Sequence, residues 1–120
     1  MDDRFILNGS KLIRINLNLD KDEYYDVVSI PEGITEIGEE AMTDYDGTEC
    51  MLSFPKTLKR IGKSAFFGAS SAFCDGDLFL EEGIEEIGDN AFCDCGLSTI
   101  TLPQGLKKIG AWFFAPCLER

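Results

Sequence analysis

The sequence contains no histidine. Without an imidazole, the chain cannot form a Ser-His-Asp or Cys-His nucleophile system, and it lacks the commonest general base near neutral pH. Zinc sites that depend on histidine ligands are excluded by the same absence. We therefore expect neither enzymatic activity nor a bound cofactor.

Basic residues are also scarce: Lys and Arg number 11 against 22 Asp and Glu, a formal charge of −11. Such a charge repels nucleic-acid phosphates and anionic lipids, so no nucleic-acid partner is expected. No apolar run is long enough to span a bilayer, and the opening residues MDDRFILNGS carry aspartates where a secretory signal carries basic residues. The chain as written is expected to be cytoplasmic without membrane insertion, or to lie at the cell surface if it is part of a longer protein.

The cysteines predict neither a full disulfide framework nor a metal site. Their odd number would leave one thiol unpaired, and their apolar neighbours favour free, mostly buried thiols. Cys93-Asp94-Cys95 lacks the further paired cysteines or histidines that structural zinc usually requires. Paired carboxylates such as Glu85-Glu86 have no sequence reason to be desolvated, which argues against acid-base catalysis. The cysteines are Cys50, Cys74, Cys93, Cys95 and Cys117.

What the sequence does contain is an internal repeat. Four segments share one eight-residue frame, PEGITEIG, PKTLKRIG, EEGIEEIG and PQGLKKIG, and the isoleucine of each Ile-Gly pair falls at position 37, 61, 87 or 109. The offsets of 24, 26 and 22 residues lie in the range of leucine-rich repeats. A unit of this kind buries its apolar face only by stacking on its neighbours, so the spacing predicts a solenoid.

Each repeat unit is expected to contain a short strand, a turn and one turn of helix. Apolar and polar residues alternate just before each frame, as in Val28-Ser29-Ile30, which is typical of a strand. Proline followed two residues later by glycine, as in Ile30-Pro31-Glu32-Gly33, predicts a type I turn at the end of the strand. One-turn helices that place a large side chain in the core are expected around Ala41-Met42, Ala65-Phe66, Ala91-Phe92 and Phe113-Phe114.

Residues 1–26 do not fit the frame. The pair Asn8-Gly9 lies between two apolar segments, and this pattern predicts a β-hairpin with a type I′ turn. We expect this hairpin to cap the first repeat and to cover a strand edge that would otherwise invite strand addition. The sequence therefore divides into an N-terminal hairpin cap, residues 1–26, and four repeats, residues 27–120, the last of them truncated.

Charged residues follow the repeat as well. The two outward positions of successive frames are Thr35-Glu36, Lys59-Arg60, Glu85-Glu86 and Lys107-Lys108. These pairs alternate in sign when the layers stack, which predicts cross-layer ion pairs that fix the stacking order. The excess acidic residues lie between the repeats and in the cap. They predict an acidic rim that keeps the protein soluble or, as the alternative, binds cations or a basic partner. They are Asp20, Asp22, Glu23, Asp26, Asp44, Asp46, Glu49, Asp75, Asp77 and Asp94.

The strings IPEGITEIGEEAM and LPQGLKKIGAWFF resemble the BspA-like leucine-rich repeat family. Its units combine a Leu/Ile-Pro strand end, an Ile-Gly pair, an Ala-Phe pair and a following cysteine, and the resemblance covers residues 28–120. It implies an α/β fold, a curved solenoid of short parallel strands with one-turn helices. It also implies a role in adhesion and protein binding at bacterial and protist cell surfaces, without enzymatic activity.

Two regions are candidates for protein binding. The first is the outward face of the short strands, because solenoid strand faces form continuous surfaces suited to large partners. The second is the C-terminal end, where Trp112 replaces a residue that is polar in the other units, beside Phe113 and Phe114. This apolar end is expected to cover the last layer, to form a homodimer or to pack against further repeats. The outward strand residues are Val27, Ser29, Met51, Ser53, Asp77, Phe79, Thr99 and Thr101.

The sequence thus predicts a non-catalytic protein-protein interaction module whose partner is a protein of unknown identity. It would bind through the outward strand face or the apolar C-terminal end. The alternative is a structural repeat fragment of a larger bacterial surface adhesin, in which the solenoid serves as a spacer.

Overall fold

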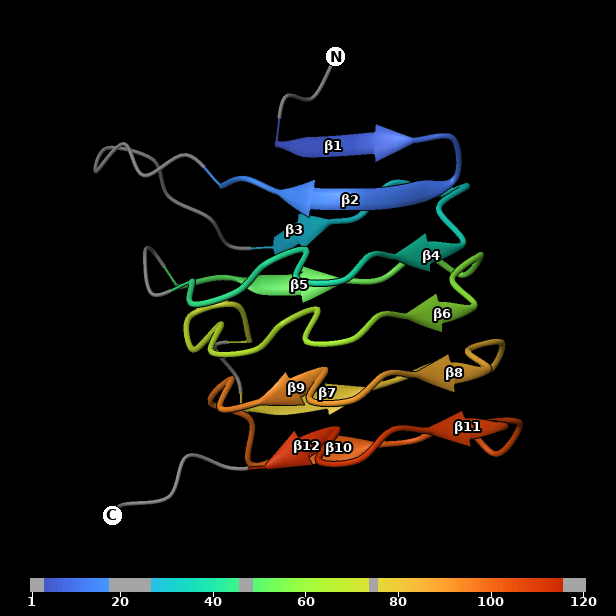
Figure 1. The fold of residues 1–120 in the computed structure, drawn as a ribbon. Helices are drawn as coiled ribbons and strands as arrows, with labels where there is room; N and C mark the ends of the chain where they lie inside the picture. Colours follow the sequence, from blue (N-terminus) through green and yellow to red (C-terminus); the bar gives the residue numbers. More distant parts are fainter. Residues whose placement is uncertain (1–3, 18–26, 46–48, 74–75, 116–120) are drawn as a thin grey trace.

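The chain is a stack of similar layers, shown by a computed structural model that describes residues 4–17, 27–45, 49–73 and 76–115 (Figure 1). Each repeat contributes one layer, and the described part of the first 26 residues adds a hairpin at the N-terminal end. The strands are β1 (Phe5–Asn8), β2 (Lys11–Ile15), β3 (Val27–Ser29), β4 (Glu36–Ile37), β5 (Met51–Ser53), β6 (Arg60–Ile61), β7 (Asp77–Phe79), β8 (Glu86–Ile87), β9 (Phe92–Cys93), β10 (Thr99–Thr101), β11 (Lys108–Ile109) and β12 (Phe114–Ala115).

One side of the stack is a six-stranded sheet in the order β1-β2-β4-β6-β8-β11. Its strands are parallel from β2 onward, and the Ile-Gly isoleucines pair in register: Ile37 with Ile61, Ile61 with Ile87, and Ile87 with Ile109. Leu12 of the hairpin extends this apolar column by pairing with Ile37. The predicted solenoid of stacked parallel strands is therefore confirmed.

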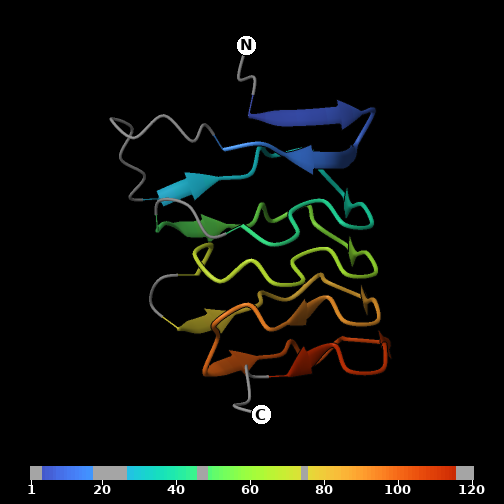
Figure 2. The same ribbon diagram turned by 60° about the vertical axis from the view of Figure 1, so that its left-hand side comes forward.

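The other side of the stack is interrupted. Strand β3 pairs with β5 and β7 pairs with β10, both in parallel, but β5 and β7 do not pair with each other (Figure 2). An antiparallel bridge between Met51 and Phe73 occupies the edge of β5 instead, and the Leu52 amide donates to the Ala72 carbonyl at 3.1 Å. This break falls in the longest of the three repeat offsets, where the extra residues leave room for another segment.

The core between the two sides contains an aromatic cluster at its centre. Phe66 and Phe92 occupy equivalent positions in adjacent layers, and their rings stack with centroids 5.4 Å apart. Phe73 and Phe54 complete the cluster with tilted or edge-on contacts. In the first three repeats the alanine that precedes the large residue, as at Ala65, is fully buried, which allows layers to pack closely.

The expected one-turn helices are wrong, and with them the α part of the expected α/β fold, because the described residues contain strands but no helix. In each unit the residue just before this segment has a positive φ, for example +55° at Ser64 and +59° at Asn90. The second amide after it donates to the next layer: Phe66 donates to the Ala91 carbonyl at 2.8 Å. Inter-layer hydrogen bonds therefore take the place of a continuous intrahelical series, and no described segment forms a helix that could cross a membrane.

Inter-layer hydrogen bonds run in both directions along the stack. Beside the strands of the six-stranded side, an amide of the later layer donates to the earlier one, as from Gly62 to Ile37 at 2.8 Å. Across the core, an amide of the earlier layer donates to the later one, as from Met42 to Ala65 at 2.7 Å. Each layer is therefore both a donor and an acceptor toward each of its neighbours.

Two turns differ in detail from the sequence-based expectation. The hairpin forms, with β1 antiparallel to β2, but Asn8 pairs with Lys11, so the loop is Gly9-Ser10. Only Gly9 has a positive φ there, which rules out a type I′ turn. After β3 the hydrogen-bonded turn begins at Pro31 rather than one residue earlier, because the Ile34 amide donates to the Pro31 carbonyl.

Candidate functional site

The eight outward strand residues lie on the β3-β5-β7-β10 side of the stack. Their intervening residues Val28, Leu52 and Leu78 are buried, and Ile100 is half-buried, so the alternation of the strands is as the sequence predicts. The parallel register brings Val27 beside Met51 and Phe79 beside Thr101. These residues therefore form one surface, and their role in binding stays a prediction.

A hollow of about 290 Å³ opens on this surface at the break between β5 and β7. The hollow lies here because β5 and β7 do not pair with each other through backbone hydrogen bonds. Sequence reasoning missed it, although the longer offset between the second and third frames was the available signal. Five of the predicted residues line it, namely Val27, Met51, Ser53, Asp77 and Phe79, together with buried or partly buried residues such as Phe54.

Two large apolar side chains stand exposed at this hollow. Phe79 is 70% exposed and Val27 is 58% exposed, whereas Met51 between them in the fold is half-buried. The remaining outward positions are small and polar, and the Thr99 hydroxyl hydrogen-bonds the Asp77 carboxylate across β7 and β10. The hollow thus combines an apolar rim with polar groups, which is the composition of many protein-binding sites.

The C-terminal layer is the second predicted region. Trp112 is 73% exposed and has a φ of +56°, the left-handed position that Glu40, Ser64 and Asn90 occupy in the other layers. Phe113 and Phe114, by contrast, are partly buried and pack against the core. The structure therefore separates the tryptophan, which points outward, from the phenylalanines, which cover the last layer.

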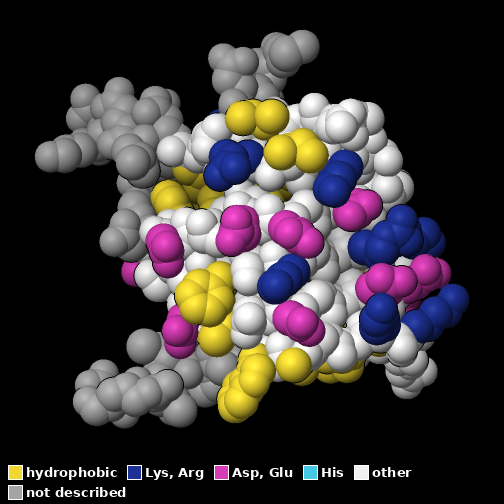
Figure 3. Space-filling view, viewed as in Figure 1, with side chains coloured by type: hydrophobic (Ala, Val, Ile, Leu, Met, Phe, Trp, Pro, Cys, Tyr) yellow, Lys and Arg dark blue, Asp and Glu magenta, His cyan; other side chains and the backbone are white. Residues whose placement is uncertain are grey.

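Charged side chains form a column on the six-stranded side, where Figure 3 displays alternating basic and acidic groups. The Glu36 carboxylate lies 3.8 Å from Nζ of Lys11 and 4.0 Å from Nε of Arg60. The Glu85 carboxylate lies 3.7 Å from Nζ of Lys107. Each pair joins adjacent layers, as the alternation of the frames predicts. The contribution of Lys11 from the hairpin was not predicted, because residues 1–26 carry no frame.

Two of the described thiols, Cys93 and Cys95, are not activated for chemistry. Cys93 and Cys95 are free thiols, the buried Cys50 thiol donates to the Ala72 carbonyl oxygen, and Cys74 and Cys117 lie outside the described residues. Burial raises the pKa of Cys95 to about 12, and burial followed by the charge of Asp94 raises the pKa of Cys93. Both thiols therefore stay protonated at neutral pH, whereas a nucleophilic cysteine needs a lowered pKa.

The acidic rim is only partly covered by the structure. Six of its members, Asp20, Asp22, Glu23, Asp26, Asp46 and Asp75, lie outside the described residues. Within the described ranges, no group of three or more acidic or cysteine side chains is placed to hold a metal ion. The rim as a cation or basic-partner site stays a prediction.

Comparison with known families matches most of the chain. A family model described as "BspA type Leucine rich repeat region (6 copies)" matches residues 21–119, which confirms the resemblance drawn from the repeat strings. No curated protein and no solved structure was found to match the chain. Leucine-rich repeats of this family are generally non-enzymatic modules that suit protein interaction.

Proposed function

Because the chain belongs to the BspA-type leucine-rich repeat family, we propose that it is a non-catalytic module that binds a protein partner through its β3-β5-β7-β10 face. The observation that carries this proposal is the exposure of Phe79 and Val27 at the hollow between β5 and β7. An exposed aromatic side chain beside a concave surface is a typical anchor for a protein contact. The polar residues around the hollow would form the rim of the interface.

The expected energy is concentrated in a few residues. Complete burial of a side chain such as Phe79 contributes about 1.5–3 kcal/mol, whereas exposed polar rim residues contribute little. Thr99 and Thr101 would therefore shape the surface, and Phe79 would hold the partner. Changing Phe79 to a charged residue removes the apolar contact and places a charge where the interface excludes water.

A capture experiment tests this proposal. Immobilised wild-type protein and the variants Phe79→Asp, Val27→Asp and Ile6→Asp would be exposed to the same cell extract, with retained proteins identified by mass spectrometry. Ile6 lies on β1, outside the strand face, and is also an exposed apolar residue, so it is the matched control. We expect a partner that the wild type and Ile6→Asp retain and that Phe79→Asp loses at least tenfold. Equal retention by all four proteins would reject the strand face.

A second candidate interface is the C-terminal end, where Trp112 supports self-association or stacking within a longer surface protein. Left-handed backbone conformation is unfavourable for a bulky L-residue by roughly 1–2 kcal/mol, and Asn or Gly would tolerate it better. Strain of this kind that is kept on an exposed side chain favours a functional contact over a role in stability. The wider expectation of a cytoplasmic or cell-surface location stays a prediction.

A further inference from the structure

A second groove lies on the opposite, six-stranded side, above the glycines of the Ile-Gly pairs. Each glycine amide donates to the preceding layer, from Gly88 to Ile61 at 2.8 Å and from Gly110 to Ile87 at 2.7 Å. A Cβ atom at Gly62 would lie 2.8 Å from the Ile37 carbonyl oxygen, and one at Gly88 would lie 2.6 Å from the Lys63 amide nitrogen. The close approach of the layers thus keeps the floor of the groove free of side chains.

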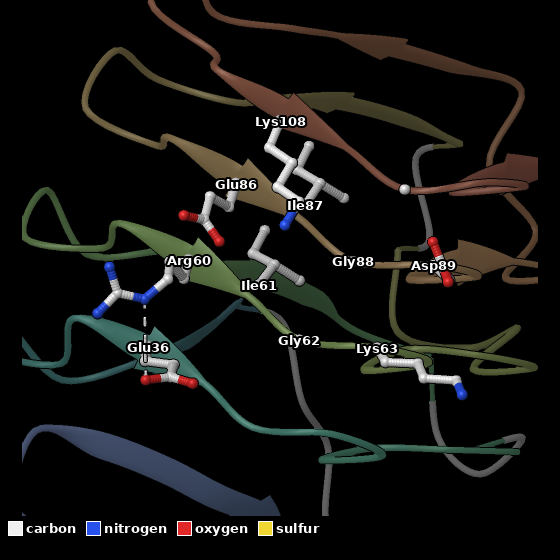
Figure 4. A pocket seen from close by; sticks show the side chains of 11 residues that line it. Glu36, Arg60, Ile61, Gly62, Lys63, Glu86, Ile87, Gly88, Asp89 and Lys108 are labelled. Carbon is white, nitrogen blue, oxygen red and sulfur yellow. Dashed lines mark ion pairs between the residues drawn. The ribbon is translucent and has the colours of Figure 1, made fainter.

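Two hollows along this column form one groove. Each has a volume of about 320 Å³, and the two share Glu36, Gly62 and Lys63. One extends toward Lys11 of the hairpin and the other toward Lys108 of the last layer. The groove therefore crosses the strands at right angles and runs along the stack (Figure 4).

Both walls of the groove alternate in charge from layer to layer. On one wall the paired strands bring Lys11, Glu36, Arg60, Glu86 and Lys108 into one column. The other wall carries Glu39, Lys63 and Asp89, and Figure 4 shows Lys63 and Asp89 across the glycine floor from Arg60 and Glu86. Each of the three middle layers thus has one sign on both walls, Lys11 and Lys108 each add a charge on one wall only, and the four positive and four negative side chains sum to zero.

Several of these charges are available to a ligand. Among the described residues that line the groove, Glu36, Lys11 and Arg60 alone take part in ion pairs, and the Asp89 carboxylate accepts a hydrogen bond from the Ala111 amide at 2.7 Å. Glu86, Lys63 and Lys108 form no ion pair with another described residue. Unpaired charges in alternating rows can select a ligand by the pattern of its charges rather than by its total charge.

We propose that this groove binds an extended peptide in which acidic and basic side chains alternate with a three-residue period. Adjacent rows of a parallel sheet lie about 4.8 Å apart, so rows of like sign recur about every 9.6 Å. A polyproline II chain advances about 9.3 Å in three residues and returns the side chain to the same edge. In a β-strand, residues on one face recur about every 6.8 Å, which does not match.

Other ligand shapes fit the groove less well. A hollow of about 320 Å³ that runs for about 10–14 Å has a mean cross-section of roughly 20–35 Å², enough for one extended chain. An α-helix is about 10–12 Å across with its side chains and would not reach the glycine floor. A uniformly acidic chain would gain from the basic rows but would face Glu86 and Asp89 between them.

Peptide binding tests the proposal directly. The probes are a fluorescent peptide (Glu-Pro-Lys)₄ and a block peptide of the same composition, Glu₄Pro₄Lys₄, measured by fluorescence anisotropy at low salt. We expect the alternating peptide to bind at least tenfold more tightly than the block peptide, with the difference lost at high salt because exposed charges are screened. Equal affinities, or no binding of either peptide at millimolar concentration, would overturn the proposal.

Protein variants locate the site. Lys63→Glu reverses the charge on one wall of the groove, in the layer where Arg60 and Lys63 are both basic. This variant should weaken binding of the alternating peptide at least fivefold. Lys56→Glu makes the same change in charge on an exposed residue that does not line the groove, and it should have little effect. Equal effects of the two variants would refute the groove as the site. Phe79→Asp should leave peptide binding unchanged, which separates this inference from the proposed strand-face interaction.

Discussion

At the scale of single residues, one equivalent position has a left-handed backbone in all four repeat layers. Glu40, Ser64, Asn90 and Trp112 all have a φ between +55° and +59°. Polar residues, above all Asn, tolerate this conformation better than bulky apolar ones, so the pattern explains why three of the four are polar. Trp112 is the exception, and its conformation does not follow from its own side-chain preference.

Ionisation of Cys95 predicts a loss of stability in alkaline solution. Burial raises the pKa of this thiol from 9.0 to about 12, so the folded state keeps a proton that the unfolded state releases. The contribution of the protonated thiol to the free energy of unfolding is fully present below pH 9, and it declines as the pH rises toward 12. At a pH of about 10.5 the loss amounts to roughly 2 kcal/mol.

Urea unfolding at a pH of about 8 and about 10.5 measures this effect. The midpoint of the wild type should fall between the two conditions by more than that of Cys95→Ala, which has no thiol to ionise. Cys93→Ala is the control, because Cys93 is the less buried of the two cysteines and its removal should change the fall less. If the urea midpoints of the wild type and Cys95→Ala fall equally between the two pH values, ionisation of the buried Cys95 thiol does not cause the loss of stability.

At the scale of elements, ion pairs between layers fix which strand follows which. Arg60 lies between Glu36 and Glu86 in the strand register, and it lies 4.0 Å from the Glu36 carboxylate. Exposed ion pairs of this kind contribute up to about 1 kcal/mol each, and like charges on adjacent strands cost a similar amount. The ion pairs of the column therefore favour one stacking order of the strands, each by a small free energy.

Reversing the charge of Arg60 tests this role. Arg60→Glu puts a carboxylate between Glu36 and Glu86 and should lower the free energy of unfolding by about 1–2 kcal/mol at low salt, less at high salt. Arg14→Glu on β2 is the matched control, because Arg14 is exposed and forms no ion pair with the other described residues. Urea midpoints give the comparison, and equal midpoints for the two variants would show that the column adds nothing to stability.

The repeat frame predicted the Ile-Gly column, the strand alternation and the charge pattern because each depends on local spacing. It did not predict the absence of helices, since the amide of Phe66 finds its acceptor in another layer at Ala91. Nor did it predict the break between β5 and β7, because that break depends on how residues 71–73 pack against β5. The groove above the glycines was missed since a side-chain-free floor becomes a surface only after the layers stack.

At the scale of the whole molecule, the two ends of the described stack differ. The hairpin covers the first layer through β2, whereas β11 has a strand neighbour on one side only, namely β8. Trp112 and Ile109 are exposed in this last layer, beside Lys107 and Lys108. Apolar contacts at this end would favour association, and the lysines would oppose it when two copies meet end to end.

A homodimer through this end therefore has a recognisable salt dependence. Solution mass across a protein concentration series should reveal a dimer that becomes tighter as salt rises, because salt screens the lysines. Trp112→Glu should weaken this dimer at least tenfold, while Ile6→Asp at the opposite end should leave it unchanged. A mass equal to the monomer at every concentration and salt would exclude the dimer.

The opposed directions of the inter-layer hydrogen bonds bear on how the molecule interacts electrostatically at a distance. The Gly62 amide donates toward the N-terminal end of the stack and the Met42 amide donates toward the C-terminal end, so peptide dipoles along the stack oppose one another. Unlike an α-helix, whose aligned amides give its ends partial charges of opposite sign, this stack gains no axial macrodipole as layers are added. The field at each end is therefore determined by its side chains, and a repeat can be added or lost without changing the field felt at the other end.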